Sequence, residues 1–188
     1  VSGFKVDLPG SISKYNLSPD LATWGKGIAN GFSFCALTGK KEIMDLGGIK
    51  NLGKEKIFLI STTHGGETHA IRAGIKTIEE FKEKKVIKHN HKIGNLIIVK
   101  TQEVINRMQL EDFIEITPCP WMVVFSFKNK KQDFCNGHRT YFLQEMISEN
   151  VLFQGIFVPS LSHKDNEVNF FINAFEKAAR KYLEILDS

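Results

Sequence analysis

Lys26 lies between two glycines, directly after a short run that reads as a β-strand, in the stretch SPDLATWGKGIANGF (18–32). A lysine amine is a nucleophile that forms Schiff bases with carbonyl groups where its surroundings favour the uncharged form. Gly25, Gly27 and Gly31 have no side chains that would keep a flat cofactor away from the amine. From these residues alone, the alternative is a solvated lysine in a surface loop.

A second stretch, STTHGGETHA (61–70), is typical of a phosphate-binding turn. It places hydroxyl side chains, among them that of Thr63, before two glycines and the expected start of a helix. The amides at a helix N-terminus point outward and, together with the helix dipole, favour anions. An ordinary strand-to-helix turn, with Ser and Thr as caps, is the alternative.

The same stretch contains His64, Glu67 and His69, which are residue types that bind zinc. Zinc motifs on a helix place two histidines four residues apart, on one face. Here two glycines intervene and the histidines are one position farther apart, so we expect no metal site. A metal hydrolase using these three residues stays a rival interpretation. A serine hydrolase is unsupported, because no Gly-x-Ser-x-Gly motif is present.

The composition excludes several classes of protein. The chain has 188 residues, of which 42% are hydrophobic and 24% charged, as in ordinary globular proteins. Its net charge of +4 is spread along the chain without a basic stripe among aromatic residues, so no nucleic-acid partner is expected. No apolar run approaches the roughly 20 residues that span a bilayer. Three cysteines without a Cys-x-x-Cys pair indicate a reducing compartment, and we expect the cytoplasm.

Apolar periodicity predicts the elements that must position the candidate residues. In the first half, buried strands are expected at 32–37 and 56–61, and helices at 65–84 and 86–108. In the first of these helices an apolar stripe recurs at three- and four-residue spacing, which predicts a face turned toward a core. The stripe consists of Ile71, Ile75, Ile78 and Phe81.

The second half has a different texture. Paired strands are expected at 113–118 and 121–127, then a helix at 137–150 and a strand at 155–160. Ser162 with Asp165 makes a capping box before a last helix. Strands alternating with helices predict an α/β first part, and the remainder a small α+β part. We place the boundary near residue 100, which gives domains 1–100 and 101–188.

The order and separation of these motifs resemble the class III family of pyridoxal-phosphate-dependent aminotransferases, and most of all its glutamate-1-semialdehyde aminomutase branch. The family pattern has Pro-Asp-Leu, then Thr shortly before Gly-Lys, and the chain has these at 19–21 and 23–26. A Gly-Lys-x-Glu-Ile-Met helix follows at 39–44, and Ser-Thr-x-Gly-Gly before a long helix matches 61–66. The match is detailed over residues 1–84 and looser toward the C-terminus.

The resemblance implies the C-terminal part of a fold type I large domain, followed by a small α+β domain. It implies that Lys26 forms the Schiff base with pyridoxal 5′-phosphate and shuttles a proton, and that Thr63 hydrogen-bonds the cofactor phosphate across a dimer interface. The activity implied is that of an aminotransferase or aminomutase that acts on a small-molecule amino donor and acceptor. A homodimer with shared active sites is the expected assembly.

The chain also departs from the family pattern. The aspartate that pairs with the cofactor ring nitrogen belongs upstream of Val1, so we expect a C-terminal part that is inactive alone. Many relatives have Asn-Pro where this chain has Glu67 and Thr68, and the stretch GIFVPS carries no arginine for a substrate carboxylate. The alternative function is a non-catalytic homologue or subunit that keeps the fold without the chemistry.

Overall fold

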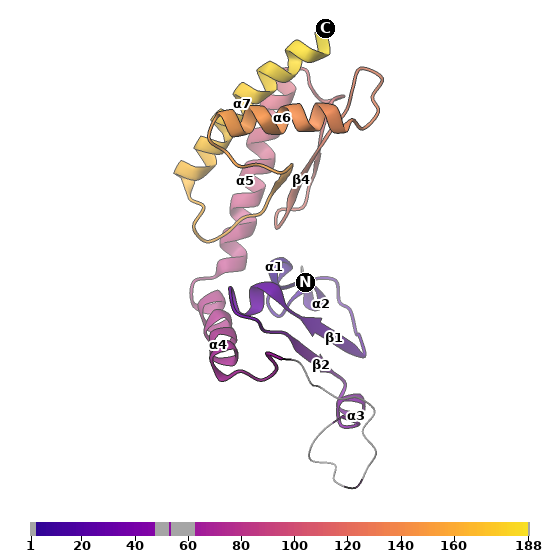
Figure 1. Ribbon diagram of the computed structural model, residues 1–188, viewed down its shortest axis with the longest axis vertical. Helices are drawn as coiled ribbons and strands as arrows, with labels where there is room; N and C mark the ends of the chain where they lie inside the picture. The colour runs from indigo at the N-terminus through magenta and orange to yellow at the C-terminus, as the bar shows by residue number, and fades with distance from the viewer. Residues whose placement is uncertain (1–2, 48–52, 54–62, 188) are drawn as a thin grey trace. The chain divides into compact units, whose positions relative to one another are not determined.

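The chain divides into two compact units, Val1–Ile87 and Lys88–Ser188. The computed structural model describes residues 3–47, 53 and 63–187 (Figure 1). The mixture of helices and strands confirms the α/β class. The expected domains, 1–100 and 101–188, concern the folding units of the complete protein and stay a prediction.

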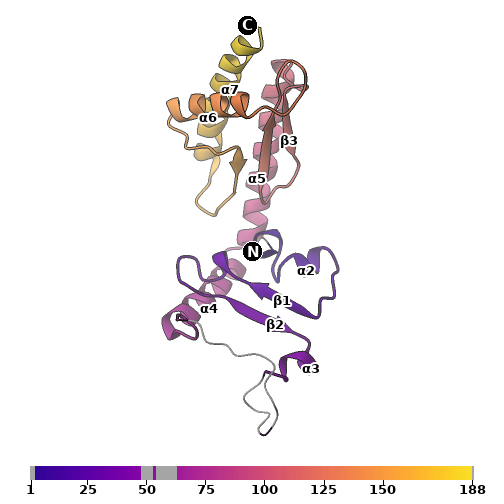
Figure 2. The same cartoon turned by 45° about the vertical axis from the view of Figure 1, so that its right-hand side comes forward.

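The first unit is built around one β-hairpin and one long helix. Strands β1 (Leu21–Trp24) and β2 (Ala36–Gly39) pair antiparallel, with Leu21 opposite Gly39 and Trp24 opposite Ala36 (Figure 2). In the described part of this unit, the α-helices are α1 (Gly3–Val6), α2 (Ser11–Lys14), α3 (Lys41–Met44) and α4 (Thr68–Glu83).

Two of the expected strands need comment. The strand expected at 32–37 starts only at Ala36, because the residues before it form the return of the loop that contains Lys26. The backbone N–H of Phe32 bonds the carbonyl of Ala29 in this return, at 3.4 Å. The strand expected at 56–61 lies outside the described residues.

The core-facing stripe expected on α4 is wrong in its first half. Ile71 and Ile75 are 40% and 45% exposed, whereas Ala70 and Gly74 are the buried residues of this helix. The reason is steric, since α4 packs closely against the loop after β1, where the ring of Phe34 leaves room only for a small residue at Gly74. A methyl group at Gly74 would lie 3.2 Å from the ring of Phe34.

The second unit combines a three-stranded antiparallel sheet with three helices. The strands β3 (Ile114–Thr117), β4 (Val123–Phe127) and β5 (Ile156–Phe157) lie in that order in the sheet. The helices are α5 (Val86–Arg107), α6 (Asn136–Ser148) and α7 (Asp165–Asp187), and α5 begins two residues before the unit does (Figure 1). These elements match the expected ones to within a few residues at their ends.

One large hydrophobic core holds the second unit together. Along β4, Val123, Phe125 and Phe127 point inward and are at most 2% exposed, as strand alternation requires. The apolar face expected on the last helix is confirmed, because Phe175 and Tyr182 on α7 are fully buried. The hydroxyl of Tyr182 donates a hydrogen bond to the carbonyl of Lys128 at 2.5 Å, so its polar end is satisfied inside the core.

The start of α7 differs from the expected capping box. The helix begins at Asp165, so Ser162 lies outside its first turn. Glu167 is the side chain that reaches back, and its Oε2 accepts a hydrogen bond from the backbone N–H of Lys164 at 2.9 Å. The cap therefore lies two residues later than the sequence suggested.

Gly94 on α5 provides a test of this packing. A methyl group at Gly94 would overlap the carbonyl group of Pro120, so Gly94→Ala must push α5 away from the turn that precedes β4. We expect the variant to lose about 2–3 kcal/mol of unfolding free energy, as overpacked cores do. Urea denaturation followed by far-UV circular dichroism measures the loss.

Gly137→Ala on α6 is the matched control. A methyl group there would meet only the sulfur of Cys135, at 3.7 Å, which is an ordinary contact. Because alanine favours helix, this variant should be neutral or gain up to about 1 kcal/mol. Equal stability of the two variants would contradict the tight contact at Gly94.

Candidate functional site

Lys26 lies at the start of a single 3-10 turn, η1 (Lys26–Ile28), that follows β1 directly. Its backbone has φ +52°, in the left-handed region that residues with side chains rarely adopt. Gly25, in contrast, is simply extended, with φ −162°. The unusual backbone therefore falls on the lysine itself and not on the glycine before it, and its side chain is exposed.

Buried residues directly after Lys26 hold this loop from behind. Ile28 and Ala29 are 7% and 1% exposed. A methyl group at Gly27 would lie 3.9 Å from the ring of Phe4 on α1, so this glycine passes close to that helix. Left-handed backbone at a residue other than glycine persists only where surrounding contacts determine it, as these do.

The hairpin fixes the other end of the loop. Trp24 donates a hydrogen bond from Nε1 to Oγ1 of Thr38 on the opposite strand, at 2.8 Å. At the far end, Nζ of Lys40 lies 2.5 Å from Oδ1 of Asp20. These exposed contacts join β1 to β2 and so determine the position of Lys26 at the end of β1.

Thr63 opens an exposed turn, 63–66, that leads into α4. Gly66 in this turn has φ +78°, a conformation that explains one of the two glycines. The hydroxyl residues Ser61 and Thr62 of the expected phosphate cradle lie outside the described residues. Both predicted site residues, Lys26 and Thr63, thus lie in loops of the first unit with their side chains exposed.

Glu67 connects the two histidines of this stretch. His64 Nδ1 lies 3.0 Å from one carboxylate oxygen of Glu67, and His69 Nε2 lies 3.3 Å from the other. The hydrogen bond from His64 holds the pKa of the Glu67 carboxyl below its usual range. Among the residues that the structure describes, no group of three or more His, Cys, Asp or Glu has the geometry to hold a metal ion.

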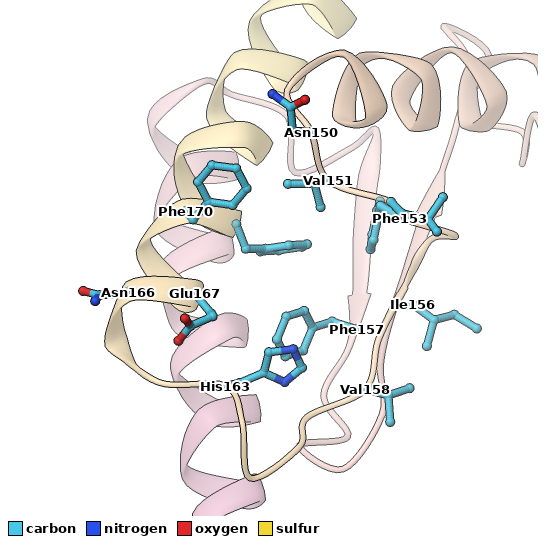
Figure 3. A pocket seen from close by; sticks show the side chains of 12 residues that line it. Asn150, Val151, Phe153, Ile156, Phe157, Val158, His163, Asn166, Glu167 and Phe170 are labelled. Carbon is cyan, nitrogen blue, oxygen red and sulfur yellow. The ribbon is translucent and has the colours of Figure 1, made fainter. Parts of the chain in front are cut away.

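The sequence did not reveal a cavity of about 640 Å³ in the second unit (Figure 3). It opens between the segment 150–158 and the beginning of α7, and its apolar wall includes Leu152 and Phe170, which are 85% and 53% exposed. No motif marks this cavity in the sequence, because its lining combines ordinary apolar residues with Asn150, His163, Asn166 and Glu167 at no recognisable spacing.

His163 is the titratable ring of this cavity, and it packs at a tilt against Phe157, with 5.0 Å between ring centres and 40° between ring planes (Figure 3). Its Nδ1 accepts a hydrogen bond from the backbone N–H of Ser160 at 3.0 Å, which leaves the proton on Nε2 in the neutral form. Burial lowers the pKa of His163, and His89 lowers it further, whereas Glu167 opposes both.

Comparisons with known proteins agree over nearly the whole chain. A family model described as aminotransferase class-III matches residues 11–179. The chain is 27% identical over 187 residues to 3-aminobutyryl-CoA aminotransferase of Cloacimonas acidaminovorans. This match covers 98% of the chain and 43% of that protein. The chain is 28% identical over 195 residues to glutamate-1-semialdehyde 2,1-aminomutase of Nitrosopumilus maritimus, covering 96% and 44%.

Solved structures with a similar fold are also transaminases. A transaminase with pyridoxal phosphate bound superposes with a TM-score of 0.85 at 13% identity, over 99% of this chain and 44% of that one. This likeness confirms the expected fold, that of part of a fold type I enzyme. The chain spans less than half the length of each relative.

The left-handed backbone at Lys26 predicts an unusual order of stability. Lys26→Gly should be more stable than Lys26→Ala by about 1 kcal/mol, because glycine adopts this conformation without steric cost. Urea denaturation of both variants measures the difference. At the helical position Lys41 the order should reverse, since glycine is the poorer helix former. The same order at both positions would contradict a left-handed Lys26.

His163 predicts a pH dependence of stability. Because its pKa is lowered from 6.5 in the folded chain, the unfolded chain binds more protons near and below pH 6.5. The contribution of His163 to stability is therefore present above pH 6.5 and is lost as the pH falls toward the folded pKa. Urea midpoints at a series of pH values should fall less steeply for His163→Asn, and parallel curves would contradict the assignment.

Proposed function

Because the chain belongs to the class III aminotransferase family, we propose that it carries the attachment lysine of a pyridoxal-phosphate-dependent aminotransferase or aminomutase. One observation carries the assignment of this role to Lys26. The chain holds this lysine in a left-handed conformation, at φ +52°, with the amine exposed and the following residues buried. Lys85 also has a left-handed backbone, at φ +49°. What distinguishes Lys26 is this conformation together with its place in the Gly-Lys-Gly loop after β1, which matches the family pattern.

The residues present fit the cofactor chemically. The amine of Lys26 would hold the aldehyde carbon, and the joining of amine and aldehyde releases one water molecule. The hydroxyl of Thr63 would donate to the phosphate, beside the amides of the turn that leads into α4. When bound, the cofactor supplies an electron-accepting ring. When the amine of Lys26 is not bonded to the cofactor, it would accept and return the proton at the substrate carbon.

Other parts of the protein must supply the remaining walls of this site. The cavity beside the loop, lined by Trp24 and Gly25 among others, is about 100 Å³, well below the roughly 300–1,000 Å³ of typical ligand sites. We propose that the complete protein is a homodimer with shared active sites, and that these 188 residues alone are inactive. In this proposal Thr63 serves the site of the partner subunit, as the resemblance implies.

Exposed apolar side chains support the same proposal. Leu21 and Leu37 on the hairpin are 44% and 38% exposed, and Ile71 and Ile75 on α4 are exposed as well. A two-stranded sheet is marginally stable by itself in water, so β1 and β2 would gain from further strands. We propose that the remainder of the complete protein covers these faces.

The substrates are small molecules that give and receive an amino group. The chain is almost equally similar to a relative named as an aminotransferase and to one named as an aminomutase, at 27% and 28% identity. Both activities would need the same roles of Lys26, and they differ in whether the reacting molecule leaves before the amino group returns. The proposal therefore includes both.

A reducing compartment, the cytoplasm, completes the proposal. Cys35, Cys119 and Cys135 are all free, which suits such a compartment. No helix in the described parts of the chain is both long and apolar enough to cross a membrane.

The test is covalent labelling of the full-length protein. After addition of pyridoxal phosphate and reduction with borohydride, we expect one adduct per chain, which peptide mapping places on Lys26. Lys26→Ala should abolish this adduct. Lys40→Ala is the matched control, because Lys40 is another exposed lysine of the same hairpin but is paired with Asp20. Labelling scattered over several lysines, or none at Lys26, would favour the non-catalytic homologue.

A further inference from the structure

Glu67 lies at the N-cap position of α4 but does not cap it. A short Ser, Thr, Asp or Asn side chain at this position ordinarily accepts a hydrogen bond from a backbone N–H of the first turn. Glu67 makes no such bond. Its two carboxylate oxygens are used instead by His64, at 3.0 Å, and by His69, at 3.3 Å.

The two histidines lie on opposite sides of Glu67 in the chain. His64 directly follows Thr63 in the exposed turn, and its Nδ1–H donates to Glu67. His69 lies in the first turn of α4, and its Nε2 lies 3.3 Å from the other oxygen, an electrostatic contact rather than a hydrogen bond. The carboxylate thus joins the turn that carries Thr63 to the body of the helix.

The same helix end contacts the loop that carries Lys26. The ring of His69 lies edge-on to Phe32, with 5.6 Å between centres, and Phe32 closes that loop. One turn farther along α4, Gly74 approaches Phe34. A continuous series of contacts therefore runs from the Thr63 turn through Glu67 and His69 to the Lys26 loop.

We propose that Glu67 is a positioning residue, which holds the Thr63 turn at a fixed place relative to α4 and the Lys26 loop. This inference rests on the proposed function, in which Thr63 binds the cofactor phosphate. Single exposed ion pairs contribute little to stability. The hydrogen bond with His64 and the contact with His69 act instead on the freedom of a short turn with a left-handed glycine, Gly66.

The test compares two ligands that differ only in the phosphate. In the full-length protein, Glu67→Ala should weaken the binding of pyridoxal phosphate by about tenfold, the equivalent of one or two hydrogen bonds. The affinity for pyridoxal, which has no phosphate, should not change. Glu67→Gln retains one acceptor oxygen, so its loss of pyridoxal phosphate affinity should be about half that of Glu67→Ala on a logarithmic scale. Glu79→Ala, at another exposed carboxylate of α4, is the control and should bind like the unmodified protein.

A double-mutant cycle separates positioning from a general loss of structure. If Glu67 acts through Thr63, Glu67→Ala should have almost no further effect on pyridoxal phosphate affinity in a Thr63→Ala background. Additive effects, or equal weakening of both ligands, would overturn the inference. If the unmodified protein already binds the two ligands equally, the role of Thr63 in the proposed function fails, and the inference fails with it.

Discussion

The close approach of α4 to the loop after β1 is the contact on which the first unit depends. It is possible because Ala70 and Gly74 present almost no side chain at the contact. The approach buries Ile28 and Ala29, so the backbone directly before them has little freedom. A left-handed lysine costs of the order of 1 kcal/mol, and such a conformation persists only where neighbouring contacts determine it. The position of Lys26 therefore depends on two small residues, Ala70 and Gly74, that lie far from it in the sequence but on a helix that packs against its loop.

The two units bury their apolar side chains to different extents. In the second unit, β4 and the helices around it enclose a common core in which Phe142 and Phe175 are fully buried. In the first unit, the hairpin and α4 leave large apolar side chains such as Leu21 and Ile75 exposed. Burial of such side chains is worth about 1.5–3 kcal/mol each. A surface that covers the first unit would thus add much of its stability, which agrees with a chain that spans less than half of its relatives.

Periodicity predicted the second unit well because its elements pack through their own side chains. Ile97 and Ile105 on α5 are fully buried, as a stripe at helical spacing requires. On the first half of α4 the same argument failed, since periodicity identifies an apolar face but not the ring of Phe34, which lies against Gly74 and leaves no room for a larger residue there. The role predicted for Lys26 comes from its neighbours and from the family pattern, and it stays a prediction. Its left-handed backbone could not be predicted, because it arises from contacts far apart in the sequence.

The candidate residues are held from one side and open on the other. Lys26 and Thr63 expose their side chains, while the groups that restrain their backbones are buried neighbours or side chains of α4. A group that must bind a ligand covalently needs fixed backbone and free reactive atoms together, and support from behind provides both. The role proposed for Glu67 follows the same pattern, because its contacts with His64 and His69 would restrain the backbone of the turn without touching a ligand.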